Sequence, residues 1–150
     1  MELSVNVDIE KPIKEVWKAI TDFKNCTSYI KSIIKLDIIE EPKGTLIGFK
    51  WKETRMMFGK EATETMWITD YAKNKFYQTK AESHGSVYVS KLMVEPNNKN
   101  TKLTMSFSSE PQTLFVKIFS FCTGFMLKGF MKKELLKDLN DIKFHLENIK

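Results

Sequence analysis

The first ten residues alternate between apolar and polar side chains, which predicts a half-buried β-strand over Met1–Glu10. Pro12 ends this alternation, and proline suits the first turn of a helix because its missing N–H has no helical partner there. Apolar residues then recur at helical spacing, so we expect a short amphipathic helix over Pro12–Thr21. Asp22–Lys31 is expected to form a second short helix or an irregular turn.

From Ser32 to Glu110 the apolar residues recur with a period of two, and Gly, Pro and Asn cluster at steady intervals. The connections are of hairpin length, and one of them is expected at residues 55–57. Strands joined in this way form an antiparallel meander. The predicted strands are Ile33–Glu40, Thr45–Thr54, Phe58–Thr69, Lys75–Glu82, Val87–Glu95 and Thr101–Ser109.

After Pro111 the period returns to about 3.6 residues, which predicts a long helix from about Gln112 to Asn148. Its last turns carry an apolar stripe with Lys, Asp and Glu opposite. The stripe consists of Leu135, Leu136, Leu139, Ile142, Leu146 and Ile149. A helix of this length packs best on a wide, curved sheet. We therefore predict one α+β domain over residues 1–150, with a seven-stranded curved antiparallel sheet, a long C-terminal helix and two short helices between strands 1 and 2.

The segment Thr113–Met131 is apolar enough to raise the question of a membrane span. It contains Lys117 and Lys128, and each lysine in the middle of a span costs about 2.5–3.5 kcal/mol. A core helix or a helix at a membrane interface is therefore expected.

Composition is that of an ordinary globular protein, with 42% hydrophobic and 29% charged residues. The net charge of +5 is spread along the chain among glutamates, and no nucleic-acid partner is predicted. The densest run falls at helical spacing and is most simply a solvated helix face. It comprises Lys128, Lys132, Lys133 and Lys137. Weak, transient attraction to anionic lipid surfaces fits the charge equally well.

The two cysteines, Cys26 and Cys122, form no CxxC pair and no cluster with histidine, so neither a metal site nor a cofactor is predicted. Buried free thiols are expected instead. The N-terminal residues show no signal-peptide pattern, so we expect a cytoplasmic protein. The expected oligomeric state is a monomer or a weak homodimer.

Three segments resemble the SRPBCC superfamily, which includes START-related lipid-transfer domains, birch-pollen-allergen-like proteins and polyketide cyclase-like proteins. They are Val7–Trp17, followed by Asp22-Phe23, then Gly48–Glu64 (GFKWKETRMMFGKEATE) and Lys132–Glu147. The middle segment is similar to the polyketide cyclase and dehydrase branch. This resemblance implies the helix-grip fold, in which the sheet and the long helix enclose a cavity. It does not by itself assign a reaction.

Strand alternation predicts which side chains face that cavity. Ile47, Phe49 and Trp51 share one face of their strand, and Val87, Val89 and Met93 are expected to face inward on theirs. Phe and Met suit flexible apolar ligands. A solid aromatic core is the alternative interpretation. The predicted ligand-binding residues are Trp17, Phe49, Trp51, Glu53, Arg55, Glu64, Met66, Val89, Met105, Phe107, Phe115, Phe119, Cys122 and Met126.

The same alternation places Glu53 and Glu64 inward, with Arg55 at the strand end. A buried carboxylate needs a partner, so these three residues are a candidate anchor for a ligand's polar group. The alternative is a surface salt bridge that follows a bulge.

Catalytic patterns are sparse, because the sequence has no Ser-His-Asp set and no metal-ligand spacing. Glu64 and His84 are the candidate acid–base residues. His84 lies in a predicted turn, and the resemblance implies that this turn is near the cavity mouth. Binding or transport of an apolar molecule such as a lipid, polyketide or isoprenoid is the leading hypothesis. The alternatives are a cofactor-free cyclase or dehydratase, and a protein-interaction module of the chaperone-activator type.

Overall fold

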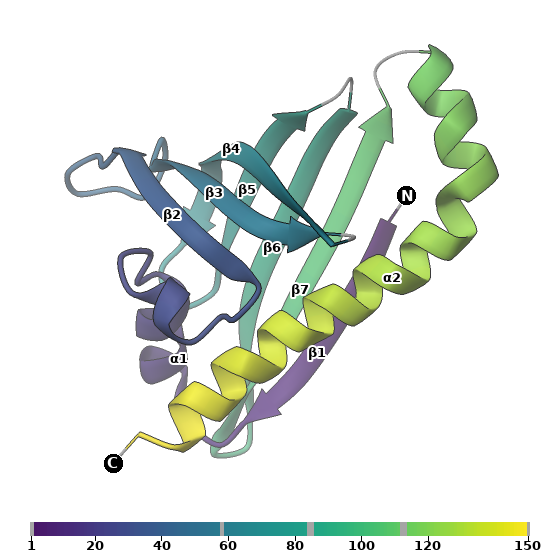
Figure 1. Ribbon diagram of the computed structural model, residues 1–150. Coiled ribbons are helices and arrows are strands. Elements are labelled where there is room, and N and C mark those ends of the chain that lie inside the picture. The colour runs from purple at the N-terminus through teal and green to yellow at the C-terminus, as the bar shows by residue number, and fades with distance from the viewer. Residues whose placement is uncertain (1, 58, 84–85, 112–113, 150) are drawn as a thin grey trace.

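The computed structural model describes residues 2–57, 59–83, 86–111 and 114–149, and within them the side chains other than those of residues 57, 83, 86 and 110–127. Seven antiparallel strands form one sheet in the order β1-β7-β6-β5-β4-β3-β2. Figure 1 shows this sheet curving around a long C-terminal helix, as predicted. The elements are β1 (Glu2–Ile9), α1 (Ile13–Ile20), η1 (Cys26–Ser28), β2 (Ile33–Glu40), β3 (Lys50–Met57), β4 (Lys60–Ala72), β5 (Phe76–Ser83), β6 (Ser86–Asn97), β7 (Asn100–Pro111) and α2 (Leu114–Glu147).

Between β1 and β2 the chain forms one α-helix and one short 3₁₀ turn. Pro12 precedes α1, which buries Val16, Trp17 and Ile20 at helical spacing. Of the two short helices predicted here, the second is η1, only three residues long. Ile20, Phe23 and Cys26 of this segment line the space between the sheet and α2.

The β3–β4 hairpin differs most from the predicted strands. Gly48 has φ +88°, a conformation that favours glycine, and it interrupts the alternation. The strand therefore begins at Lys50, and Ile47, predicted to share a face with Trp51, is 51% exposed. Residues 55–57 belong to β3, and the connection is the two residues 58–59, with Gly59 at φ +74°.

The predicted inward face of β6 is wrong. Ser90, Leu92 and Val94 are buried, whereas Val89 and Met93 have the opposite parity and lie on the outer face. Both faces of this strand carry apolar side chains, so alternation alone gave no basis for choosing between them. Pairing with the neighbouring strands decides the matter, because it sets the face of each residue.

The second half of α2 packs on the sheet through an apolar ridge. The ridge consists of Leu135, Leu139, Ile142 and Leu146, all buried. Leu136 and Ile149, which the predicted stripe included, are 38% and 50% exposed. Leu136 does not pack on the sheet because it lies about 100° around the helix from Leu135, outside the face that meets the sheet.

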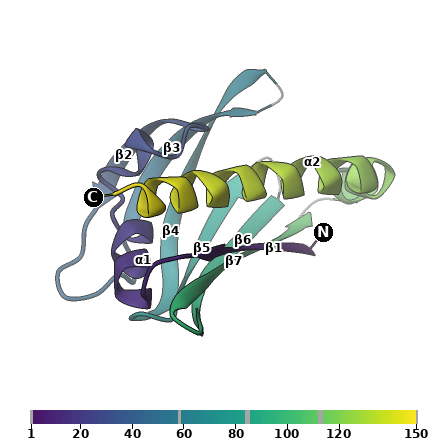
Figure 2. The same cartoon turned by 90° about the horizontal axis from the view of Figure 1, so that it is seen from below.

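Polar contacts lie on both flanks of this ridge. On one flank, Asp141 Oδ2 accepts a hydrogen bond from the backbone N–H of Lys31 at 3.0 Å. Further along the same flank, His145 stacks on Tyr29 with ring centroids 4.1 Å apart. In Figure 2, α2 lies in front of the sheet, with β2 and β3 on one side and β1 on the other.

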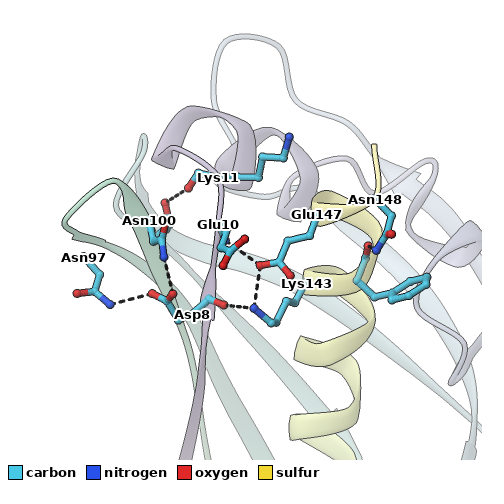
Figure 3. A network of polar contacts seen from close by, with 10 residues as sticks. Asp8, Glu10, Lys11, Asn97, Asn100, Lys143, Glu147 and Asn148 are labelled. Carbon is cyan, nitrogen blue, oxygen red and sulfur yellow. Dashed lines mark hydrogen bonds and ion pairs between the residues drawn. The ribbon is translucent and has the colours of Figure 1, made fainter. Parts of the chain in front are cut away.

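The other flank joins the end of α2 to the β1–α1 junction (Figure 3). Lys143 donates to the backbone carbonyl of Asp8 and to Glu147, and Glu147 Oε2 accepts from the backbone N–H of Glu10 at 2.8 Å. The Asp8 carboxylate in turn accepts from Asn97 and Asn100, each at 2.8 Å. The last turns of α2 are thus tied to β1 and to the β6–β7 hairpin.

Among the residues that the structure describes, we find no helix with the length and apolar character needed to cross a membrane.

The apolar ridge predicts different costs for two neighbouring leucines. Leu139 is 0% exposed, so Leu139→Ala should cost about 2–5 kcal/mol of unfolding free energy, as for other large-to-small core changes. Leu136→Ala should cost less than about 1 kcal/mol, because that side chain is already partly in water. Urea denaturation measures both, and equal losses would contradict the observed packing of α2.

Asp8 predicts a pH dependence. Hydrogen bonds from Asn97 and then Asn100 hold the pKa of the Asp8 carboxyl below its ordinary value of 3.8. A pKa lowered by folding adds stability above the ordinary pKa, and that stability is lost as pH falls through the folded value. Asp8→Asn should therefore have a lower Tm than the parent protein at neutral pH, and the difference should shrink in acid. A Tm difference that does not change with pH would refute this role of the carboxylate.

Candidate functional site

A cavity of about 100 Å³ lies between the concave face of the sheet and α2. Most of its wall is apolar, and it takes side chains from α1, the η1 segment, six strands and α2. The lining residues are Ile20, Phe23, Cys26, Tyr29, Ile30, Ile33, Leu36, Trp51, Glu53, Arg55, Met66, Tyr77, Thr79, Ser90, Leu92, Met105, Asp138, Leu139 and Ile142. Close-packed protein interiors seldom leave a void of this size, so the cavity is a candidate binding site.

Alternation along β3 places three successive inward side chains in the wall, namely Trp51, Glu53 and Arg55. Met66 lies opposite Trp51 in the register of β3 and β4, and Met105 completes the sheet side from β7. These five residues were predicted as ligand-binding, and the structure brings them together around one space.

Two other predicted residues, Phe49 and Trp17, are buried and contact residues of the wall. Phe49 stacks on Phe23 with ring centroids 4.7 Å apart. Trp17 meets Tyr77 edge to face at 6.3 Å. They support lining residues and do not line the cavity themselves.

Arg55 holds together the polar part of the wall. Its Nε donates to Glu53 Oε2 and its terminal nitrogen donates to Asp138 Oδ2, both at 3.0 Å. Trp51 Nε1 donates to Glu53 Oε1 at 3.3 Å. The side chains of Arg55 and Asp138 are 21% and 7% exposed, so this ion pair is shielded from solvent. We call Glu53, Arg55 and Asp138 the charged cluster.

The charged cluster has one guanidinium and two carboxyl groups, a formal charge of −1 when both are ionised. Burial raises the pKa of the Asp138 carboxyl above its ordinary value, although Arg55 acts in the opposite direction. Burial alone would lower the pKa of Arg55, but Glu53 and Asp138 outweigh it and the pKa is raised. Asp138 Oδ1 is buried and has no hydrogen-bond partner among the residues that the structure describes. The cluster therefore has an acceptor that a bound donor would satisfy.

Glu64, predicted as part of the anchor, pairs with Glu53 in the register of β3 and β4 and so lies on the same face of the sheet. It is half-buried and does not line the cavity. In the structure, the second carboxylate beside Arg55 comes from Asp138 on α2.

Hydroxyl groups form a second polar patch on the wall. Thr79 and Ser90 face each other across β5 and β6 and share a hydrogen bond between their hydroxyl oxygens. Tyr77 lines the cavity beside them, and burial raises the pKa of its phenol, which stays protonated at neutral pH.

Cys26 is buried, as expected, and donates from Sγ to the carbonyl of Phe23. Burial raises the pKa of its thiol to about 12, which keeps the thiol protonated at neutral pH. Among the side chains that the structure describes, no group of three or more His, Cys, Asp or Glu is placed to hold a metal ion.

The remaining predicted residues lie elsewhere. Val89 is on the outer face of the sheet, opposite to the prediction, because the register of β6 places Ser90 and Leu92 inward. Phe107 is half-buried and stacks on Tyr88, 5.7 Å between ring centroids. Five further predicted positions are outside the described residues or side chains. They are His84, Phe115, Phe119, Cys122 and Met126.

Sequence reasoning missed Asp138, which it grouped with the charged residues opposite the apolar stripe. A signal was present, because Leu135, Asp138, Leu139 and Ile142 follow the i, i+3, i+4, i+7 spacing of one helix face. A carboxylate on such a face needs a buried cation, and Arg55 was the candidate at hand.

Comparisons with known proteins agree with this architecture. A family model described as polyketide cyclase / dehydrase and lipid transport matches residues 1–147. Three solved structures illustrate the likeness of fold. A Thermus thermophilus protein has a TM-score of 0.81 at 12% identity, covering 97% of each chain. The Zhui aromatase/cyclase from Streptomyces has a TM-score of 0.77 at 14% identity, covering 98% of this chain and 93% of its own.

The third structure is a START superfamily protein from Mycobacterium smegmatis, with a TM-score of 0.75 at 15% identity, covering 97% of this chain and 98% of its own. No curated protein matches the chain. The predicted superfamily and helix-grip fold are confirmed. At these identities the likeness to solved structures supports the fold alone.

The charged cluster predicts a large cost for removing its cation. Arg55→Met leaves Glu53 and Asp138 buried without their partner and should cost about 3–5 kcal/mol of unfolding free energy. Adding Asp138→Leu should recover much of the loss, since it removes one unpaired charge. The control is Lys35→Met, which breaks an exposed ion pair with Asp37 and should cost less than about 1 kcal/mol. If urea denaturation gives both single variants the same loss, the cluster is not the buried unit described above.

Proposed function

The chain belongs to the polyketide cyclase/dehydrase and lipid transport family, and we propose that it binds an apolar small molecule in the cavity between the sheet and α2. The observation that carries this proposal is the cavity itself, whose largely apolar wall is interrupted by one charged cluster. Apolar surface gives affinity without direction, while a few fixed polar groups orient the ligand. Trp51, Met66 and Met105 provide apolar contact in this proposal.

The charged cluster takes the role of the anchor. No residue in the described part of the chain donates to Asp138 Oδ1, so a ligand hydroxyl reaching it satisfies this buried oxygen with a hydrogen bond. A ligand carboxylate is disfavoured, because the cluster already carries two carboxyl groups for one guanidinium. The proposed ligand is therefore an uncharged apolar molecule with a hydroxyl group, and simple fatty acids bind less well.

A second candidate function is favoured by the same residue. The raised pKa of Asp138 brings a buried carboxyl group closer to neutrality, which is how a general acid or base is tuned. A cofactor-free cyclase or dehydratase would use Asp138 for proton transfer while Arg55 balances the developing charge. Turnover lost in Asp138→Asn, with binding retained, would distinguish this enzyme from a carrier.

Filling the cavity tests the binding proposal. We expect Met105→Trp to weaken binding of the neutral fluorophore N-phenylnaphthylamine at least about tenfold, because the indole occupies ligand space. Met93→Trp makes the same change on the outer face of the sheet and should leave the affinity unchanged. Fluorescence titration measures both, with circular dichroism to show that each variant is folded. Equal affinities in the two variants would place the probe outside the cavity and sink the proposal.

The anchor has its own test with two small aromatic probes. Naphthol carries a hydroxyl and naphthalene does not. Asp138→Leu should weaken naphthol binding about tenfold through loss of one hydrogen bond to a charged group, and leave naphthalene binding within about twofold. Glu64→Gln is the control variant, because Glu64 lies on the same face of the sheet but does not line the cavity. If Asp138→Leu weakens both probes equally, Asp138 shapes the cavity and does not recognise the hydroxyl.

A further inference from the structure

Between residues 128 and 147, α2 sorts its charges by side. Its exposed residues are lysines, an asparagine, a glycine and two large apolar side chains. They are Lys128, Gly129, Lys132, Lys133, Leu136, Lys137, Asn140 and Phe144. The acidic residues of the same stretch are half-buried or buried.

Three of the four acidic side chains of this stretch are turned inward by their partners, and the fourth, Glu134, is half-buried. Asp138 binds Arg55, Asp141 accepts from the backbone N–H of Lys31, and Glu147 accepts from that of Glu10. These contacts hold α2 to both flanks of the sheet. They leave the opposite side of the helix with cations and no exposed carboxylate to neutralise them.

We define the outer face of α2 by its lysines and large apolar residues, Lys132, Lys133, Leu136, Lys137 and Phe144. Helical spacing brings Leu136 and Phe144 onto one side of the helix, two turns apart, with Lys137 and Asn140 between them. Phe144 is 69% exposed, the highest value among the large hydrophobic residues that the structure describes as exposed. Lysines beside protruding aromatic and aliphatic side chains are the composition of helices that lie on membrane surfaces.

We propose that the outer face of α2 docks the protein on an anionic lipid bilayer. Leu136 and Phe144 enter the head-group region, and the lysines meet the lipid phosphates and carboxylates. A nucleic acid or another polyanion would also attract the lysines, but it would leave the two apolar side chains in water. The apolar pair therefore favours the bilayer.

This arrangement relates the bilayer to the cavity. Leu139 and Ile142, on the other side of the same helix, line the cavity wall. In the docked protein, the thickness of one helix, about 10 Å, separates the bilayer from the cavity. The docking proposal does not depend on the identity of any ligand, and it is tested without one.

The test is co-sedimentation of the full chain with two kinds of large vesicle, phosphatidylcholine alone and phosphatidylcholine with about 30% phosphatidylserine, at about 0.1 M salt. Binding to the anionic vesicles is expected, with much weaker binding to the neutral ones. Lys133→Gln/Lys137→Gln should lower the partition coefficient about 30-fold, which is about fivefold for each lysine near the surface. Phe144→Ser should lower it about tenfold.

Matched controls carry the same changes elsewhere. Lys52→Gln/Lys80→Gln removes two exposed lysines from the outer face of the sheet, and Ile39→Ser removes an isoleucine that is 48% exposed on β2. Both should partition within about twofold of the parent protein, because their sites lie away from α2. All substituted positions are exposed, and circular dichroism checks that each variant is folded.

Three outcomes would overturn the proposal. The first is no binding to the anionic vesicles, and the second is equal binding to both kinds of vesicle. The third is binding that depends on the lysines but not on Phe144. This third result would identify a general polyanion surface, which binding of duplex DNA with the same lysine dependence would then confirm.

Discussion

The ion pair between Arg55 and Asp138 joins the sheet to the long helix across the cavity. Arg55 stands on β3, near the outer edge of the sheet, and Asp138 stands on the last helix, 83 residues later. Neither charge is stable alone at this depth, so each fixes where the other element lies. Glu53 completes the arrangement by aligning the guanidinium from its own strand. Among the lining residues that the structure describes, these three are the only charged ones.

α2 packs on the sheet because its apolar residues recur at helical spacing, and not because the helix is apolar overall. One ridge supplies leucines and an isoleucine to the sheet, and the positions beside it supply groups that bond to backbone atoms on either side. Every residue except proline has a backbone N–H. Asp141 and Glu147 therefore bind groups whose position depends on the path of the chain and not on the identity of a side chain. α2 is thus held by its apolar ridge and by polar contacts on both flanks. These contacts oppose rotation of the helix about its axis and translation along it, which keeps the cavity wall in one position.

The sequence was sufficient for the architecture because most elements carry a clear period. β2 was predicted with its observed bounds, and α2 to within two residues at its start. Prediction failed where two answers satisfied the same pattern. β6 is apolar on both faces, so only its neighbours decide that Val89 lies outside. Helical spacing placed Asp138 on the buried face of α2, but its partner is 83 residues away in sequence, and the spacing does not identify that partner.

The position of the closing contacts in the chain has a consequence for the order of folding. Asp8 and Glu10 meet Lys143 and Glu147 only after every strand of the sheet has been synthesised. Until then, the concave face of the sheet has no helix to cover it, and its apolar side chains are open to water and to other chains. Contacts this distant in sequence also form slowly, since a long loop must close before they give any stability. The same grip that creates the cavity thus makes the nascent chain vulnerable to aggregation until its last turns are in place.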